Sequence, residues 1–335
     1  MTENTEQFND ALRDLLADHC TPHHVRAIEA GESPRVLWDL LECSGFADAL
    51  LSEDQGGAAL TLADAFALFE LCGSFAMPVP LAETMVARAL IAQANVAPPS
   101  GSIALGRLEP QPDGGARCER VACGRTTDWL LARHGAGSVL LQSETATKSG
   151  GVFVLDATLA WSASALAEAR ALPVAFDLRL YQACLAAAQL SGALMAVFDR
   201  TLQYANDRNQ FGRPIGKFQA IQHQLAVISE HVFAARMAAQ IGCRATGLSP
   251  DRLRVAVAKA RTGEAALEVA SLSHSIHGAI GFTEEFDLQL FTRRLHAWRQ
   301  TGGSESYWQD VLGEALLDAR GALALDLIRI TTDVP

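Results

Sequence analysis

The chain has 335 residues, of which 49% are hydrophobic and 19% are charged, and its net charge is −11. This composition is that of a folded globular protein, and the length allows two or three domains with their own cores. The acidic balance excludes nucleic acid and anionic membrane surfaces as main partners. We also expect no membrane span, because no uncharged apolar run reaches about 18 residues.

The cysteine and histidine positions indicate neither disulfides nor a metal site. Seven cysteines are scattered without a Cys-x-x-Cys pair, which favours reduced, mostly buried thiols in a cytoplasmic protein. The amino-terminal residues are polar and lack the apolar core of a signal sequence. His19, His23 and His24 lie close together, but no acidic or thiol ligand shares their face at a convincing spacing, so we predict no metal.

Hydrophobic periodicity predicts three domains in chain order. Residues 1–97 have helical periodicity, beginning with a stripe between Phe8 and Leu16, and predict an N-terminal helical domain. Residues 98–176 contain Pro- and Gly-rich turns between short apolar runs, which predict a small β-rich domain. Residues 177–335 return to helical periodicity and predict a helical bundle. The predicted strands are Trp129–Ala132, Ser138–Leu141 and Val152–Leu155.

The stretch Tyr204–Gln219, YANDRNQFGRPIGKFQ, follows a long apolar helical run and contains several polar side chains. Pro214 has no amide donor, so we expect one helix to end with Arg208 in its last turn and the next to begin at about Lys217. Arginine offers a planar fork of donors that suits a phosphate or diphosphate. An ordinary helix corner with a solvated arginine accounts for these residues equally well.

Three segments of the chain resemble the acyl-CoA dehydrogenase family. The stretch after Tyr204 is similar to the family pattern R-x-x-F-G-x-x-I-x-x-x-Q, and HSIHGAIGFTEEFDLQLFTRRLHAW, His274–Trp298, resembles Q-x-x-G-G-x-G-(F/Y)-x-x-E-(F/Y). The helical domain of that family is similar to a third segment, SEDQGGAALTLADAFALFELCGSFAMPVPLAET. The resemblance implies a mainly α fold with an N-terminal helical domain, a reduced middle β domain and a C-terminal four-helix bundle.

The resemblance also implies FAD as the cofactor. In the family, the second segment lies against a flavin that is carried largely by a neighbouring subunit. Two departures stand out, because Ser275 replaces a frequent glutamine and Ala279 replaces a glycine. A plain interhelical loop is the alternative reading of this segment. The positions that match cofactor contacts are Arg208, Asn209, Gln210, Phe211, Phe218, Gln219, Ser275, His277, Gly278, Ala279 and Ser304.

The catalytic carboxylate of the family has no counterpart at either matching position. The family chemistry needs a base that removes the α proton while the flavin accepts the β hydride. The two matching positions hold Gly302 and Gln182, and neither side chain can act as a base. Glu305 and Glu285 are candidates for a relocated base, although Glu305 also suits the start of a helix. The flavin-covering motif T-E-P-x-x-G-S-D is absent from residues 98–176.

These departures lead to a hypothesis about assembly. The chain resembles the shortened subunits of bacterial α2β2 acyl-CoA dehydrogenases that act on steroid-derived CoA thioesters. The resemblance implies that a homologous catalytic subunit supplies the base, that acyl-CoA is the substrate, and that an electron-transfer flavoprotein is the acceptor. Two alternatives stay open, an autonomous homomeric dehydrogenase with a relocated base and a scaffold subunit without flavin.

Overall fold

The computed structural model describes residues 3–245, 247–319 and 323–332. The chain forms two compact units. The first unit comprises the described parts of Met1–Leu68, Met77–Gln182 and Thr246–Leu248, and the second comprises those of Phe69–Ala76, Ala183–Ala245 and Ser249–Pro335. The predicted three-domain boundaries, after residues 97 and 176, stay a prediction.

Helices dominate the amino-terminal part of the chain, as its periodicity predicts. Leu12 and Leu16 of the first helix are fully buried, which confirms the apolar stripe. A left-handed glycine, Gly45, follows the third helix and starts a short 3-10 turn. The elements are α1 (Glu3–His19), α2 (Pro22–Glu29), α3 (Arg35–Cys43), η1 (Phe46–Asp48), η2 (Glu53–Gln55), α4 (Phe66–Ser74) and α5 (Leu81–Gln93).

Helix α5 has no exposed face between Leu81 and Ile91. It nevertheless carries Arg88, which is 4% exposed and therefore needs partners. Arg88 forms ion pairs with Glu42 and, at 2.9 Å, with Asp48. Burial alone would raise the pKa of Glu42, but hydrogen bonds from the backbone amide of Gly101, Arg88 and Trp38 hold that pKa below its usual value. Arg88 therefore ties α5 to α3 and η1.

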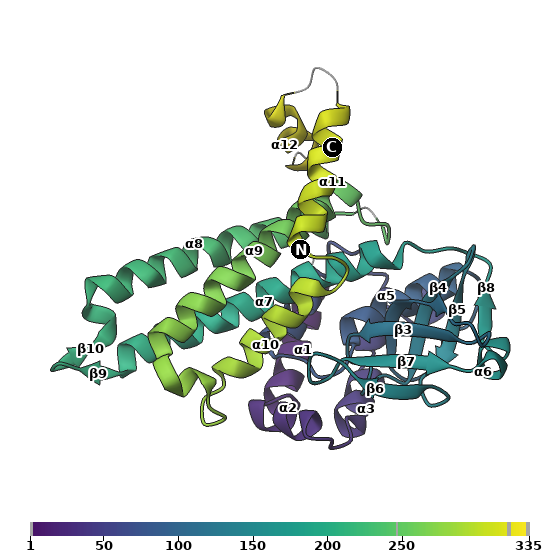
Figure 1. Ribbon diagram of the computed structural model, residues 1–335, viewed down its shortest axis with the longest axis horizontal. Helices are drawn as coiled ribbons and strands as arrows, with labels where there is room; N and C mark the ends of the chain where they lie inside the picture. Colours follow the sequence, from purple (N-terminus) through teal and green to yellow (C-terminus); the bar gives the residue numbers. More distant parts are fainter. Residues whose placement is uncertain (1–2, 246, 320–322, 333–335) are drawn as a thin grey trace. The chain divides into compact units, whose positions relative to one another are not determined.

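Two small sheets follow in the first unit (Figure 1). Apolar side chains from both sheets form one buried core. The first sheet has the order β1-β4-β5-β8, with β1 parallel to β4 and the other pairs antiparallel. The second sheet has the order β2-β3-β7-β6 and is antiparallel throughout. The elements are β1 (Ile103–Arg107), β2 (Glu109–Pro110), β3 (Ala116–Val121), β4 (Trp129–His134), β5 (Gly137–Gln142), β6 (Thr147–Gly150), β7 (Ala157–Trp161), α6 (Ala163–Ala167) and β8 (Arg170–Leu172).

Two of the three predicted strands are confirmed. Trp129–Ala132 and Ser138–Leu141 lie within β4 and β5. The prediction of a strand at Val152–Leu155 is wrong, because that segment is a turn between β6 and β7. Val152 is 85% exposed whereas Leu155 is 4% exposed, so only part of the apolar run is buried. A short run of apolar residues cannot by itself distinguish a strand from a turn that contains a few of them.

The carboxyl-terminal half is helical, and α7, α8 and α9 run side by side along it (Figure 1). Gly192 allows α7 to approach α4 closely, because a Cβ at that position would lie 1.9 Å from the carbonyl oxygen of Glu70. The elements are α7 (Leu178–Asp207), β9 (Asn209–Gln210), β10 (Arg213–Pro214), η3 (Ile215–Lys217), α8 (Gln219–Gly242), α9 (Arg252–His277), η4 (Gly278–Phe282), α10 (Leu288–Gln300), α11 (Glu305–Asp318) and α12 (Ala324–Thr332).

Helix α7 has the length and apolar composition of a membrane span. Of its most apolar window, 83% is buried within the protein, which is typical of a core helix. Cys184 of α7 lies with its Sγ 3.6 Å from the Sγ of Cys243, and both thiols are free and buried. Packing inside the protein therefore accounts for the apolar composition of α7.

A second buried polar group of α5 reaches strand β1. A carboxyl oxygen of Glu83 accepts a hydrogen bond from the backbone amide of Leu105, at 2.9 Å, and Glu83 is 5% exposed. Gln182 donates to the carbonyl oxygen of the same residue, Leu105, at 2.9 Å. Burial raises the pKa of Glu83 to about 8, while the Leu105 amide acts to lower it. Glu83 is therefore protonated at neutral pH.

We predict that Glu83→Gln makes the fold less sensitive to pH. The folded pKa of about 8 lies above the ordinary value of 4.5, so the stabilisation from neutral Glu83 is complete below pH 4.5 and is lost as pH rises to about 8. Gln stays neutral and keeps an acceptor for Leu105. The stability advantage of the variant should grow by about 1.4 kcal/mol per pH unit between pH 5 and pH 7.

Urea unfolding of both proteins at several pH values measures this difference. Glu109→Gln, at an exposed position of β2, is the matched control. A difference between Glu83→Gln and the unsubstituted chain that is the same at every pH would contradict the prediction.

Candidate functional site

The polar stretch after Tyr204 forms a β-hairpin at one end of the second unit. Helix α7 ends at Asp207, so Arg208 lies just beyond the helix and not in its last turn. Strands β9 and β10 pair with Gln210 opposite Arg213, and the amide of Ile215 donates to the carbonyl of Arg208 at 2.8 Å. Helix α8 begins at Gln219, after the 3-10 turn η3, two residues later than the sequence indicated.

The hairpin turn holds an aromatic residue in an unfavourable conformation. Phe211 and Gly212 are its two central residues, with φ angles of 53° and 81°. Positive φ at both positions is the geometry of a tight type I′ hairpin, which favours Asn-Gly. A phenylalanine there costs about 1–2 kcal/mol, and Phe211 is 92% exposed, so burial does not offset this cost. Strain of this kind at an exposed position is typical of a binding residue.

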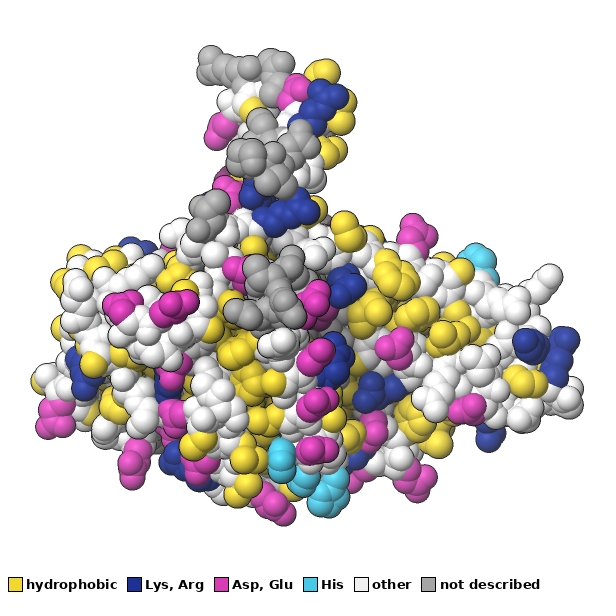
Figure 2. Space-filling view, turned by 180° about the vertical axis from the view of Figure 1, so that it is seen from behind, with side chains coloured by type: hydrophobic (Ala, Val, Ile, Leu, Met, Phe, Trp, Pro, Cys, Tyr) yellow, Lys and Arg dark blue, Asp and Glu magenta, His cyan; other side chains and the backbone are white. Residues whose placement is uncertain are grey.

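Three cations cluster at this end of the unit. Arg208, Arg213 and Lys217 are exposed, and their charged groups form no hydrogen bond or ion pair with any residue that the structure describes. Figure 2 shows basic side chains at the end of the unit that carries the hairpin, on the right of that view. On a chain with a net charge of −11, uncompensated cations of this kind favour an anionic ligand. We call this end, residues 208–219 with residues 275–279, the polar tip.

Two segments that are distant in the sequence meet at the polar tip. Gln224 of α8 donates to Ser275 of α9 at 3.4 Å, so the start of α8 lies beside the end of α9. Tyr204 donates to the carbonyl oxygen of His277 at 3.4 Å, which adds the end of α7. The structure thus brings Arg208–Gln219 and Ser275–Ala279 to the same end of the bundle.

The segment after α9 presents mainly its backbone. Ser275, Gly278 and Ala279 are exposed. Gly278 has φ 66° and ψ −146°, a conformation that essentially only glycine adopts, and a Cβ there would meet no atom within 4 Å. The glycine is therefore required by the chain path, and the space beside it is free for a ligand.

The side chain of His277 is part of the packing. It is 4% exposed and stacks on Tyr204 with a centroid separation of 4.3 Å, and Nδ1 lies 2.8 Å from the carbonyl oxygen of Ser273. Burial lowers the pKa of His277, and the hydrogen bond to Ser273 opposes that shift. The ring thus stays neutral and supports the segment, so a ligand at the tip would meet the peptide groups of this residue.

Ser304 lies away from the polar tip. It caps α11, where its hydroxyl accepts from the amide of Tyr307. The next residue, Glu305, packs against Gly263 of α9. A Cβ added to Gly263 would lie 3.1 Å from the Cβ of Glu305. Gly263 precedes Ser275 by 12 residues (275 − 263), which is about 18 Å along a helix.

The loop around Gly302, one of the two positions that match the catalytic base of the family, is held by hydrogen bonds to its backbone carbonyl groups. Gly302 and Gly303 have φ angles of 70° and 115°. The indole of Trp308 donates to the carbonyl oxygen of Gly302 at 3.2 Å. Lys259 of α9 has no exposed surface, and its Nζ donates to the carbonyl oxygens of Arg299 at 2.7 Å and Gly303 at 2.9 Å. Lys259 was not among the residues that the sequence singled out. Its place in the apolar run VAVAKA nevertheless indicated a buried lysine that needs hydrogen-bond acceptors.

Neither glutamate proposed as a relocated base, Glu305 or Glu285, lies in surroundings that favour that role. Glu305 is the first residue of α11 and forms an ion pair with Arg299. Burial alone would raise the pKa of Glu305, but the hydrogen bond and charge of Arg299 and the charge of Lys259 hold the pKa below its usual value. Glu285 is exposed. In the first unit, Gln182 is held by β1 through its amide, as described above.

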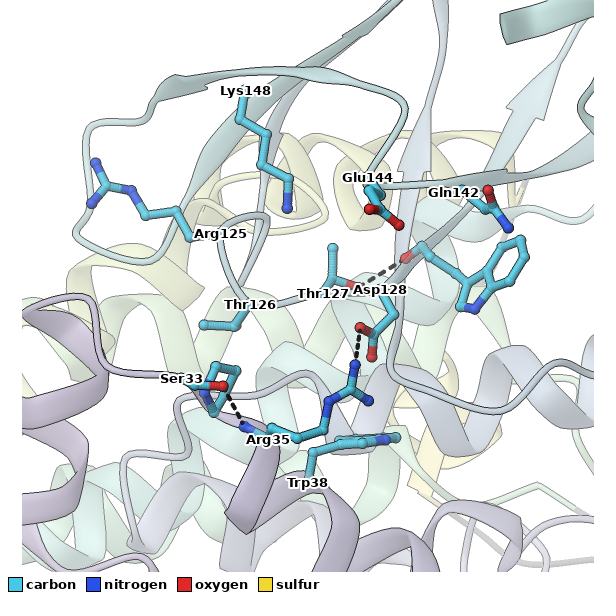
Figure 3. A pocket seen from close by; sticks show the side chains of 12 residues that line it. Ser33, Arg35, Trp38, Arg125, Thr126, Thr127, Asp128, Gln142, Glu144 and Lys148 are labelled. Atoms are coloured by element: carbon cyan, nitrogen blue, oxygen red, sulfur yellow. Dashed lines mark hydrogen bonds and ion pairs between the residues drawn. The ribbon is translucent and has the colours of Figure 1, made fainter.

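A groove of about 590 Å³ lies in the first unit, between α3 and the β-rich part (Figure 3). Lys148 points into it from one side and Arg35 from the other, with Asp128 and Glu144 between them. Arg35 and Asp128 form an ion pair at 3.6 Å. The mixed charges give the groove no clear preference for an anion or a cation, and its lining contains none of the residues singled out by the sequence. Within the described parts of the chain, no group of three His, Cys, Asp or Glu residues could hold a metal ion.

We predict that Lys259→Met destabilises the second unit by about 1–3 kcal/mol, because two buried carbonyl groups lose their donor. Lys217→Met, at the exposed tip, is the matched control and should change stability by less than about 0.5 kcal/mol. Thermal and urea unfolding measure both effects. Equal stability of the two variants would show that Lys259 does not hold the loop.

Comparison with known proteins places this geometry in one family. The N-terminal domain of acyl-CoA dehydrogenases matches residues 2–96, and their C-terminal domain matches residues 179–317. Acyl-CoA dehydrogenase IpdE2 of Mycolicibacterium smegmatis is 32% identical over 316 residues, covering 90% of this chain and 96% of that protein. IpdE2 of Mycobacterium tuberculosis is 31% identical over 308 residues, covering 89% of this chain and 92% of that protein.

Solved structures have the same fold. A variant of the Tcur3481–Tcur3483 steroid ACAD superposes with a TM-score of 0.81 at 25% identity, over 96% of this chain and 99% of that chain. The ChsE4–ChsE5 complex from Mycobacterium tuberculosis gives a TM-score of 0.81 at 19% identity, with the same coverage. The order of helical, small β and helical parts is therefore that of these enzymes. The chain belongs to the acyl-CoA dehydrogenase family.

Proposed function

We propose that this chain is one subunit of a heteromeric, FAD-dependent acyl-CoA dehydrogenase, in which a homologous subunit supplies the catalytic base. The reaction is the α,β-desaturation of a CoA thioester, and an electron-transfer flavoprotein is the proposed acceptor. Two matched structures support the assembly, since their names describe a steroid ACAD and a two-component complex. A steroid-derived thioester is the narrower form of the proposal.

The polar tip fits the diphosphate part of FAD. Arg208 offers a free guanidinium, and Gly278 leaves open space beside an exposed backbone. Arg208, Gln219 and the peptide groups around Gly278 would hold the diphosphate, and Phe211 offers an exposed aromatic face at the same end. Bound FAD supplies the acceptor for the hydride from the β carbon. The role of this chain is to bind and orient that cofactor.

The single observation that carries the proposal is the missing base. Gly302 has no side chain, and Gln182 uses its amide as a donor to Leu105. Proton removal from the α carbon needs a positioned basic group, so a chain with these two residues needs another source of it. A homologous subunit with an intact carboxylate is the simplest source, and an α2β2 assembly is the simplest closed form.

Co-expression tests this proposal directly. The chain is produced alone and together with a longer acyl-CoA dehydrogenase homologue encoded beside its gene. We expect the visible absorbance of bound flavin and acyl-CoA oxidation only from the co-purified complex. Bound flavin and turnover from the chain alone would instead support a homomeric enzyme, and a complex that never contains flavin would support a scaffold.

The homomeric alternative depends on a relocated base. Its candidates are Glu305 and Glu285, and the first is already engaged with Arg299. Replacing each glutamate by Gln in the active complex separates the two proposals. Loss of flavin reduction by acyl-CoA in either variant would favour the homomeric mechanism.

We predict that Arg208→Ala weakens FAD binding by about tenfold to a hundredfold, because a charge-assisted contact of about 1.5–3 kcal/mol is lost. Fluorescence titration of the flavin-free complex with FAD measures the dissociation constant. Unfolding of the variant serves as the control, since Arg208 is exposed and its loss should leave stability unchanged. Unchanged FAD affinity would remove Arg208 from the binding site.

A further inference from the structure

We propose that Arg213 is a second diphosphate-binding residue of the polar tip, held in position by the ring of Phe218. This inference rests on the proposed function and adds a residue to its cofactor site. The motif that pointed to Arg208 does not specify this position.

The hairpin directs Arg208 and Arg213 to the same side. Gln210 is paired with Arg213, and Ile215 is paired with Arg208 through the hydrogen bond of its amide. Residues that are opposite each other in a strand pair project to the same face, and residues two positions apart in a strand also share a face. Arg208, Gln210 and Arg213 therefore form one polar face of the hairpin.

Phe218 fixes the direction of the second arginine. The Cζ of Arg213 lies 4.2 Å from the centroid of the Phe218 ring, a cation–π arrangement. Phe211 contacts the same ring edge-on, with centroids 6.1 Å apart. An arginine stacked in this way loses little additional side-chain freedom when it binds, and its N–H groups stay free at the edge of the guanidinium.

The charge balance of the tip supports two cations. A diphosphate diester carries two negative charges, and Arg208 supplies one positive charge. Arg213 has no acidic partner among the described residues, although the chain as a whole is acidic. Of the two other cations of the tip, Arg213 and Lys217, Arg213 is the one that is stacked on a ring, and its unpaired guanidinium matches the second charge.

The test measures FAD affinity of the complete two-subunit complex by fluorescence titration at low and moderate salt. We expect Arg213→Gln to weaken FAD binding by about tenfold and to reduce its dependence on salt. Arg213→Lys keeps the charge and should recover part of the affinity, while Phe218→Leu keeps the arginine without its platform and should show a smaller loss. Arg13→Gln, at an exposed position of α1 in the first unit, removes the same charge outside the tip, and as the matched control it should bind FAD almost as the unsubstituted complex does.

The outcomes separate this inference from the function on which it rests. An unsubstituted complex without FAD overturns the proposed function itself. A complex that binds FAD equally well with Arg213→Gln overturns only the role of Arg213. If Arg213→Gln instead prevents the two subunits from associating, Arg213 faces the partner protein and the inference is likewise wrong.

Discussion

Arg88 is the charge on which the first unit depends, because it lies in a helix without an exposed face. A buried guanidinium needs charged or hydrogen-bonding partners, and removal of one partner of such a pair typically costs about 3–5 kcal/mol. Its partners Glu42 and Asp48 come from two other elements. Lys259 has the corresponding place in the second unit, where its buried amino group donates to the carbonyls of a loop, and burial lowers its pKa to about 7. Each unit thus contains a buried basic side chain that joins separate elements through hydrogen bonds.

This arrangement separates the fold from the chemistry of the family. The loop at Gly302 is held through carbonyl oxygens by Trp308 and Lys259, so its path does not depend on the side chain at that position. A carboxylate can be lost there without loss of the loop. The polar tip does not depend on this loop either, because Ser275 lies about 18 Å along α9 from Gly263, which contacts Glu305 beside the loop. A chain of this kind can keep a cofactor-binding end while a homologous subunit provides the base.

The sequence predicted the helices and the order of the parts, because long apolar periodicities depend on local geometry. It did not predict the hairpin at Asn209–Pro214, since Phe at a left-handed position contradicts the usual turn preference. The strand predicted at Val152–Leu155 was wrong because a run of four residues is too short to show a reliable hydrophobic period. The site was predictable as two motifs, and their meeting at one end of the bundle required the antiparallel packing of α8 and α9. The sequence did not predict the burial of His277, because Tyr204, on which its ring stacks, lies 73 residues away.

The exposed ring of Phe211 has a consequence for how the cell makes this protein. Phe211 is 92% exposed at the tip of the hairpin, and in the proposed assembly the partner subunit or the cofactor would cover its ring. Surplus copies without that neighbour would be prone to aggregation and proteolysis. Matched synthesis of the two polypeptides, as from one transcript, would keep such orphans rare.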